Sequence, residues 1–408
     1  MNKISFLLSG TVISALLLGA CSKNSSSPTP QDQAPVTKSS EPPKGQPANP
    51  PVVGSNEPST ASEAEMIQAI QQDNVSMVTQ ALADGWKIES ELKIGTGPEY
   101  SGTTMLPALS YAAFLGKIST AKALIAAGAK VSGSPNWNGE EPIHYAAEGN
   151  QVDMIAFLAQ SGADLNAMPK VPGLLPATPA IALAAQSGNV EAVNALIKAG
   201  ANLNAQVSSD LGDGTSQTFN TALHEAACAK PGDAAYKSRV AITEALLAGG
   251  ANPNVEARLT SWTPLLCAAY SSNHEVVALL LKAGVDPNYV STTYYNTVTQ
   301  SEFALKLAAS GSDVAMAKLL VDAHANVNQT NVAKFGTTAL HDAAYSGNLE
   351  VVKYLIAQHA ALNEVSSEEY DDDTTKTTPL DLALRKGHTE VATVLVAAGG
   401  KKYAELHH

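Results

Sequence analysis

The 408-residue sequence contains 25 lysines and arginines against 38 aspartates and glutamates, which gives a formal net charge of −13. An acidic surface repels the phosphates of DNA and RNA, so we expect no nucleic-acid partner. The charge would favour a basic partner, mainly through association rate and specificity, or would serve solubility alone.

The first twenty residues have the pattern of a secretory signal peptide. Lys3 forms a short positive region, and a mostly apolar run covers residues 4–18. This run is short and contains serines and a glycine, which disfavours a membrane-spanning anchor. The segment LGAC, which ends at Cys21, resembles the lipobox of bacterial lipoproteins. That resemblance implies that Cys21 carries the lipid and becomes the mature N-terminus.

Residues 21–61 are predicted to form a disordered tether behind the lipid. They are rich in Pro, Ser, Asn and Gln, and such a composition cannot bury enough apolar surface to fold. A proline-rich linker is semi-extended and would hold a folded domain away from the bilayer. By analogy with bacterial lipoproteins, Ser22 is not the Asp that retains such proteins at the inner membrane. We therefore expect an outer-membrane lipoprotein that faces the periplasm.

A unit of two short helices recurs between residues 62 and 404, and its cleanest copy is 336–363. Thr338 can cap the first helix with its hydroxyl. Leu340 is followed by an Ala-Ala pair at i+3 and i+4, so these residues share one thin face. Gly347 suits the left-handed conformation where the first helix ends. Because two such short helices bury little apolar surface alone, each copy needs neighbours on both sides.

Nine copies, including a terminal one at each end, align in this way. Measured at the Ala-Ala pair of the first helix or its equivalent, successive copies are 34 to 42 residues apart. The first copy is rich in glutamine, as a solvent-facing cap requires. The copies cover segments 65–85, 107–129, 141–166, 178–204, 221–254, 263–288, 303–328, 336–363 and 378–400.

These copies resemble the ankyrin repeat. The matching residues are Thr-Pro-Leu or Thr-Ala-Leu-His at the helix entry, Ala-Ala within the first helix, Gly-Asn or Gly-His at the turn, and Gly-Ala-Asn-x-Asn at the exit. The resemblance implies an all-α repeat solenoid, in which helix-turn-helix pairs stack and extended, β-hairpin-like fingers project from one edge. It also implies that the chain binds another protein.

Most of the excess over the ankyrin period of about 33 residues falls in the fingers. Segment 206–219 predicts a hairpin that turns at residues 212–214, and 289–299 has high β propensity and could turn near Asn296. One insertion, 230–239, instead separates the two helices of its repeat and should emerge on the opposite edge. The long fingers are 168–179, 206–219, 289–299 and 365–377.

Two cysteines other than Cys21 lie in the first helices of consecutive repeats, at Cys228 and Cys267. Stacked helices stand about 8–10 Å apart, which is long for a disulfide unless the side chains point favourably. An oxidising periplasm would allow the bond. On spacing alone, the sequence favours two buried apolar thiols.

The sequence shows no constellation of catalytic or metal-binding residues. His144, His224 and His341 occupy the same place in three repeats, which predicts hydrogen bonds between repeats rather than one cluster. His324 and His359 replace an exit Gly, and His tolerates a positive φ better than most residues. No G-x-S-x-G, P-loop or H-E-x-x-H pattern is present. We therefore expect no enzyme activity, no cofactor and no metal.

The acidic run 368–373 is the one candidate for a calcium site. It lacks the EF-hand spacing, with its glycine and terminal glutamate. A solvated loop is therefore the favoured interpretation, with calcium or a basic partner as the alternative.

Aromatic side chains on or beside the fingers are the partner-binding candidates. Exposed Trp and Tyr are the usual anchors of protein interfaces. The competing interpretation is that they pack finger against finger, and for any single residue we favour packing. The candidates are Trp137, Trp262, Tyr289, Tyr294, Tyr295 and Tyr370.

Together these patterns predict a monomeric, lipid-anchored, periplasm-facing solenoid that binds and scaffolds or protects an envelope protein, for example in stress defence. The first alternative is an immunity protein that neutralises a periplasm-acting toxin or phospholipase effector, because some bacterial ankyrin lipoproteins are associated with secreted-effector systems. A second alternative is an envelope hydrolase, which would need a nucleophile and a base hidden in the fingers. The identity of the partner stays open.

Overall fold

A computed structural model of the protein describes residues 62–95, 103–133, 139–169, 177–210, 216–257, 261–295, 298–330, 336–366 and 376–406. The predicted signal peptide, the tether and Cys21 lie outside these ranges, as do Trp137, Tyr370 and the acidic run 368–373. No helix within the described ranges combines the length and the hydropathy that crossing a bilayer requires.

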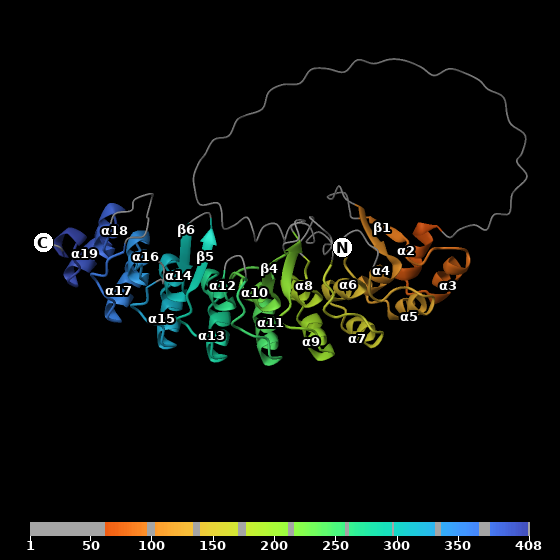
Figure 1. Cartoon of the computed structure of the whole chain (residues 1–408). Coiled ribbons are helices and arrows are strands. Elements are labelled where there is room, and N and C mark those ends of the chain that lie inside the picture. Colours follow the sequence, from red (N-terminus) through yellow and green to blue (C-terminus); the bar gives the residue numbers. More distant parts are fainter. Residues whose placement is uncertain are drawn as a thin grey trace, which may run out of the picture.

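Within the described ranges, nine helix pairs stand side by side in one row (Figure 1). The first helices of the pairs are α2 (Glu63–Gln71), α4 (Ala108–Leu115), α6 (Pro142–Glu148), α8 (Ala180–Ser187), α10 (Ala222–Ala227), α12 (Pro264–Tyr270), α14 (Ala304–Ser310), α16 (Ala339–Ser346) and α18 (Pro379–Arg385). The second helices are α3 (Val75–Ala83), α5 (Ile118–Ala126), α7 (Val152–Gln160), α9 (Val190–Ala199), α11 (Tyr236–Ala248), α13 (His274–Lys282), α15 (Val314–Asp322), α17 (Leu349–Ala357) and α19 (Thr389–Ala397). A final turn, α20 (Tyr403–Leu406), follows. The predicted all-α repeat solenoid is confirmed.

The core runs along the whole row and is thin because the first helices are rich in alanine. In α16, Leu340 and the pair Ala343 and Ala344 are buried against the first helices on either side. In α17, Val351 and Val352 are buried in the same core. Each pair therefore buries its apolar face only against its neighbours, as expected for stacked repeats.

A side chain from the next repeat completes the end of most first helices. The last carbonyls of a helix have no partner within the helix. Asn189 Nδ2 donates to the carbonyl oxygens of Ala147 (3.0 Å) and Glu148 (2.7 Å). His388 Nε2 lies 3.0 Å from the carbonyl oxygen of Tyr345 and donates to it in the same manner. The Asn or His at the turn of one repeat thus ties it to the repeat before.

The exit asparagines form a second series of ties, at the base of the fingers. Asn166 Oδ1 accepts the backbone N–H of Asn202 at 2.7 Å, and Asn288 Oδ1 accepts that of Asn326 at 2.7 Å. The amide of Lys401 donates in the same way to Asn363 Oδ1, at 2.7 Å. The Asn that ends each repeat motif therefore fixes the next repeat.

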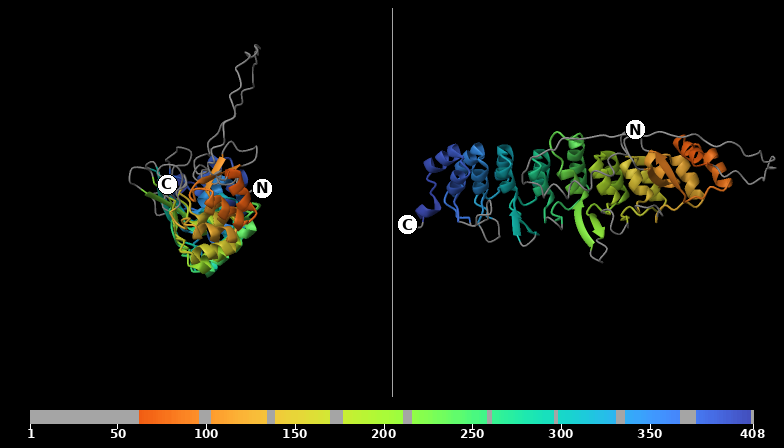
Figure 2. Two further views of the ribbon diagram at one scale, coloured as in Figure 1. Left: turned by 90° about the vertical axis from the view of Figure 1, so that its right-hand side faces the viewer. Right: turned by 90° about the horizontal axis from the view of Figure 1, so that it is seen from above.

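Three antiparallel hairpins form the described fingers. β3 (Gln206–Asp210) pairs with β4 (Ser216–Thr221), and β5 (Ser291–Tyr295) pairs with β6 (Val298–Glu302), which confirms the two predicted hairpins. Both project from the same edge of the row (Figure 2). β1 (Glu91–Gly95) with β2 (Thr103–Pro107) was not expected. Its signal is the alternation of the buried residues Leu92 and Ile94 with polar neighbours.

The insertion in the fifth repeat lies at the opposite edge, as predicted, because it replaces the turn between α10 and α11. No Asn or His remains there to complete the end of α8. Arg239 takes that place, and its Nη2 donates to the carbonyl oxygen of Gln186 at 2.6 Å. Tyr236, at the start of α11, donates its hydroxyl to Asn273 Oδ1 at 3.0 Å. The insertion is thus tied to the repeats on both sides.

The expectation of two buried thiols is wrong, because Cys228 and Cys267 form a disulfide. Their Cα atoms are 5.0 Å apart. The spacing of about 8–10 Å applies to helix axes, and each Cα stands about 2.3 Å from its axis, so Cα atoms on facing sides come much closer. Both cysteines are also partly exposed rather than buried. The disulfide joins the irregular fifth repeat to the sixth.

Candidate functional site

The three repeated histidines are structural. Each ring accepts a backbone N–H at Nδ1, so its hydrogen is on Nε2 and donates to a carbonyl oxygen beyond the repeat. Burial lowers the pKa of His144, His224 and His341 to about 4, so all three are neutral near pH 7. The amide donors are Glu141 (3.0 Å), Thr221 (3.1 Å) and Thr338 (3.2 Å), and the carbonyl acceptors are Ala167 (3.1 Å), Trp262 (3.0 Å) and Glu364 (3.1 Å). The predicted hydrogen bonds between repeats are confirmed.

His324 and His359 have φ values of 69° and 63°. They occupy the left-handed region that the exit Gly occupies in other repeats, so the backbone interpretation is confirmed. Neither residue needs a chemical role.

The fourth and seventh positions of several first helices are less buried than the positions between them, and we call them the open stripe. Residues three apart share one face of a helix. In α10, α12 and α14 these positions are the ones that are not buried, while the positions between them are. From α10 to α16 the open stripe consists of Glu225, Cys228, Cys267, Tyr270, Leu307, Ser310 and Tyr345, while Asp342, at the fourth position of α16, is buried.

Trp262 lies beside the open stripe and is partly buried. Its ring meets the ring of Tyr270 edge to face, with centroids 5.3 Å apart and planes at 62°. Its backbone carbonyl accepts from His224 Nε2 and from the amide of Ala257 at 2.8 Å. The backbone of this predicted partner anchor is therefore held by the preceding repeat and by the finger, while its ring contacts Tyr270 of the open stripe.

Tyr289 is placed by packing at the base of the β5–β6 finger. Its hydroxyl donates to the carbonyl oxygen of Ser261 at 3.2 Å. Burial and the neighbouring carboxylate of Glu256 raise the pKa of Tyr289. This residue links two adjacent fingers, which agrees with the packing interpretation.

The other four candidates are only partly described or not described. The backbone of Tyr294 and Tyr295 lies in β5, opposite Thr299 and Val298 of β6. Their side chains lie outside the described part of the chain, as do Trp137 and Tyr370. Their roles stay predictions.

Two carboxyl groups of the first helices lie in surroundings that disfavour their ionised form. Burial, together with the nearby charge of Glu140, raises the pKa of Glu148 to about 8. Burial also raises the pKa of Glu225, although Asn220 Nδ2 donates to this carboxyl at 2.9 Å. Neither residue was singled out from the sequence. The signal that could have found them is an acidic residue at the fourth or seventh position of a helix that is otherwise apolar.

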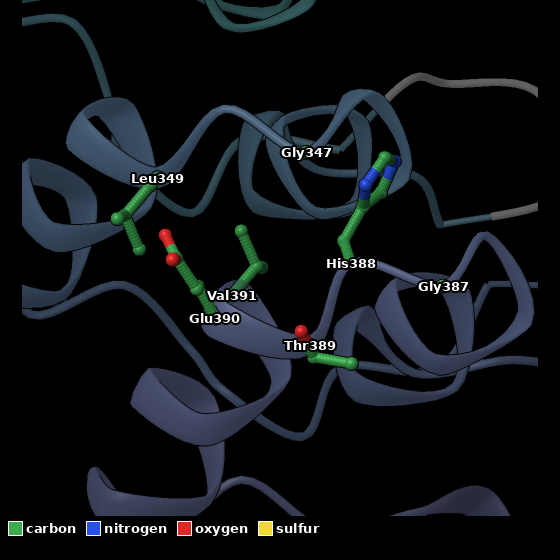
Figure 3. Close-up of a pocket in the computed structure, with 7 residues that line it drawn as sticks. All are labelled: Gly347, Leu349, Gly387, His388, Thr389, Glu390 and Val391. Atoms are coloured by element: carbon green, nitrogen blue, oxygen red, sulfur yellow. The ribbon is translucent and has the colours of Figure 1, made fainter.

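A hollow of about 250 Å³ lies between the turns of the last two repeats (Figure 3). The ring of His388 lies beneath Gly347, where an added Cβ would be 2.6 Å from Nδ1. Nε2 of this ring donates to the Tyr345 carbonyl, so the hollow lies beside a tie between two repeats. It is lined by Gly347, Leu349, Gly387, His388, Thr389, Glu390 and Val391.

Among the described residues, no group of three or more His, Cys, Asp or Glu side chains could hold a metal ion. The predicted calcium candidate, 368–373, lies outside them. The geometry presents surfaces for a macromolecule: an open stripe along the first helices and hairpins along one edge. The fold and these surfaces therefore define the class of protein: a repeat solenoid that binds macromolecules.

Family models give this class its name. The model of tandem ankyrin repeats matches residues 66–169, 232–331, 283–368 and 305–405, and the model of a single ankyrin repeat matches residues 177–207. The chain therefore belongs to the ankyrin repeat family. Membership in this family implies a role in protein–protein interaction.

The similar proteins share the repeats with this chain over part of their length. An ankyrin repeat protein of fowlpox virus (strain NVSL) is 34% identical over 136 residues, which are 33% of this chain and 37% of the viral protein. The nuclear factor NF-kappa-B p105 subunit of Gallus gallus is 29% identical over 187 residues, 46% of this chain and 17% of that protein. The mitochondrial disaggregase of Bos taurus is 34% identical over 128 residues, 30% of this chain and 17% of that protein. The chain thus spans 17% to 37% of the length of these relatives, and the envelope lipoprotein interpretation stays a prediction.

Proposed function

We propose that this protein is a lipid-anchored, periplasm-facing ankyrin repeat protein that binds an envelope protein and scaffolds or protects it. The observation that carries the binding role is the row of nine repeats, which presents the open stripe and the hairpins on one rigid support. The mechanism is presentation: the repeats hold a long surface in place, and a folded partner docks on it. In this proposal the protein acts as a monomer, binds no nucleic acid and catalyses no reaction.

Two observations support a location in the bacterial envelope. The sequence LGAC, which ends at Cys21, resembles a lipobox, and a polar tether follows it. The disulfide between Cys228 and Cys267 is independent support, because disulfides form and persist in oxidising compartments such as the periplasm. A reducing cytosol would keep both thiols free.

Replacement of Cys21 tests the lipid anchor. We expect Cys21→Ala to abolish incorporation of radiolabelled palmitate and to release the protein from the membrane fraction, because the thiol that carries the lipid is lost. Fractionation and autoradiography of the full chain expressed in a Gram-negative host measure both effects. The matched control is Ser22→Asp, which should keep the label and move the protein to the inner membrane. Continued membrane retention of an unlabelled Cys21→Ala protein would contradict the anchor.

Capture from envelope extracts tests the binding role. We expect the immobilised full chain to retain a specific envelope protein, and we expect Tyr294→Ala with Tyr295→Ala to weaken that capture with little change in the thermal midpoint. A captured toxin or phospholipase would support the immunity alternative, and a captured resident envelope protein would support scaffolding or protection. A large loss of thermal stability in the double variant would show that these tyrosines pack within the finger.

A further inference from the structure

Two tyrosines occupy the same position of the open stripe, and their surroundings differ in one respect. Tyr345 is the seventh residue of α16, and Tyr270 is the seventh residue of α12. The ammonium of Lys386 lies 4.4 Å from the centroid of the Tyr345 ring. Lys386 belongs to the next repeat, directly after α18. The fold itself therefore seats a cation on an aromatic ring of this stripe.

Tyr270 lacks such an internal cation among the residues that the structure describes. The residue that corresponds to Lys386 in the repeat after Tyr270 is Gly311, directly after α14. Within the described residues, no lysine or arginine lies over the Tyr270 ring, and 52% of Tyr270 is exposed. Trp262 supports the ring from one side, with centroids 5.3 Å apart.

Elsewhere the protein covers partly exposed rings with lysines in the same way. Lys122 of α5 lies 5.8 Å from the Phe157 centroid of α7, and Lys318 of α15 lies 5.9 Å from the Tyr354 centroid of α17. In both pairs the lysine comes from the neighbouring repeat. A positive charge over an aromatic face is attracted by the ring quadrupole. Within the described ranges, no lysine lies over the Tyr270 ring, so this ring departs from the pattern.

The charge of the chain also favours a cation at Tyr270. The chain as a whole has a net charge of −13. Complementary charge of this kind selects a basic partner segment.

We propose that Tyr270, supported by Trp262, is the seat for an arginine or lysine side chain of the protein partner, and that Gly311 keeps this seat open. The proposal rests on the protein-binding function and names the chemistry of the partner at one point of the open stripe. Gly311 is then a determinant of specificity. A long basic side chain at this position would cover the Tyr270 ring, as Lys386 covers the Tyr345 ring, and would block the partner.

Gly311 has a φ that any residue adopts, and its substitution requires only a small shift of the neighbouring backbone. Its φ is −79°, and the nearest atom to an added Cβ is the carbonyl oxygen of Leu307 at 3.2 Å. Gly311→Lys should therefore place its own ammonium over Tyr270. Gly311→Gln adds a side chain of similar reach without the charge and is the matched control.

The test is binding of a fluorescein-labelled nona-arginine peptide to the full chain, followed by fluorescence anisotropy at fixed ionic strength. A nona-citrulline peptide, which has the same shape and no charge, is the control probe. We expect Tyr270→Ala and Gly311→Lys each to weaken nona-arginine binding about two- to fivefold, as the loss of one exposed cation–π contact predicts. Tyr270→Phe and Gly311→Gln should bind as the natural chain does, because the ring stays free in both.

Tyr345→Ala controls for general changes on the stripe, since Lys386 already occupies that ring. Circular dichroism of each variant confirms that the repeats are folded. Equal binding by Tyr270→Ala, Gly311→Lys and the natural chain would overturn the proposal. Equal binding of nona-citrulline, or stronger competition by phosphocholine than by arginine amide at Tyr270, would overturn the assignment to a basic side chain.

The proposed function and this inference can fail separately. If the natural chain and Tyr270→Ala capture an envelope partner equally well, the proposed function is supported and the binding of a basic side chain at Tyr270 is contradicted. If nona-arginine binding depends on Tyr270 but no envelope partner is captured, the role of Tyr270 is supported and the proposed function is not.

Discussion

Single polar side chains make hydrogen bonds to the free backbone groups at the ends of these short helices. His341 accepts the amide of Thr338 and donates to the carbonyl of Glu364, so one ring satisfies groups in two successive segments. Its pKa lies near 4, below the ordinary value of 6.5, because burial disfavours the charged ring. A group whose folded pKa is lowered in this way stabilises the fold above pH 6.5 and loses that contribution as the pH falls towards 4. The same holds for His144 and His224, so acid should loosen the ties between repeats.

Glu148 has the opposite dependence and provides a test at this scale. Its pKa is raised from 4.5 to about 8 by burial and by the charge of Glu140, so the neutral carboxyl is the form that fits the fold. The stabilisation is present below pH 4.5 and is lost as the pH rises through 8. We expect Glu148→Gln, which is neutral at every pH, to melt about 2 °C or more above the natural chain at pH 8.5.

The same comparison at pH 4 should show no difference, because both side chains are then neutral. Thermal unfolding followed by circular dichroism at the two pH values measures this, with Glu350→Gln on the exposed face of α17 as the control. An equal effect of Glu148→Gln at both pH values would show that packing, rather than ionisation, is responsible.

At the scale of the element, the fifth repeat shows how an insertion is tolerated. Segment 230–239 removes the usual turn, and Arg239 replaces the missing Asn or His at the end of α8. The disulfide then joins the end of α10 to α12, and Ser271 Oγ donates to the carbonyl oxygen of Cys228 at 3.0 Å. These contacts keep an irregular repeat in register with its neighbours.

Removal of the disulfide should weaken this part of the row selectively. The bond closes a loop with a sequence separation of 39 residues, for which chain entropy predicts a contribution of about 4 kcal/mol. We expect Cys228→Ser with Cys267→Ser to lower the denaturant midpoint and to speed hydrogen exchange in α10 and α12 more than in α16 and α18. Addition of dithiothreitol should do the same to the natural chain and nothing to the double variant. Uniform exchange along the whole row would contradict a local role.

At the scale of the molecule, the nine described helix pairs form one line in which each pair packs against its neighbours (Figure 1). Stability in such a row is the sum of repeats and their interfaces, so a weak repeat in the middle divides it into two parts. The ties around the fifth repeat are therefore also what makes the two halves one support. A long partner that docks across the open stripe would depend on that continuity.

The nine helix pairs, the β3–β4 and β5–β6 hairpins and the structural role of the histidines could be predicted from the sequence. Each depends on local patterns, namely helix periodicity, capping residues and turn residues, and these patterns recur in nine copies. The disulfide, the substitute role of Arg239, the raised pKa of Glu148 and the surroundings of Tyr270 were decided only by the tertiary structure. Each depends on how a side chain packs in the folded row, which periodicity does not give, and among the described residues a lysine lies over Tyr345 but not over Tyr270.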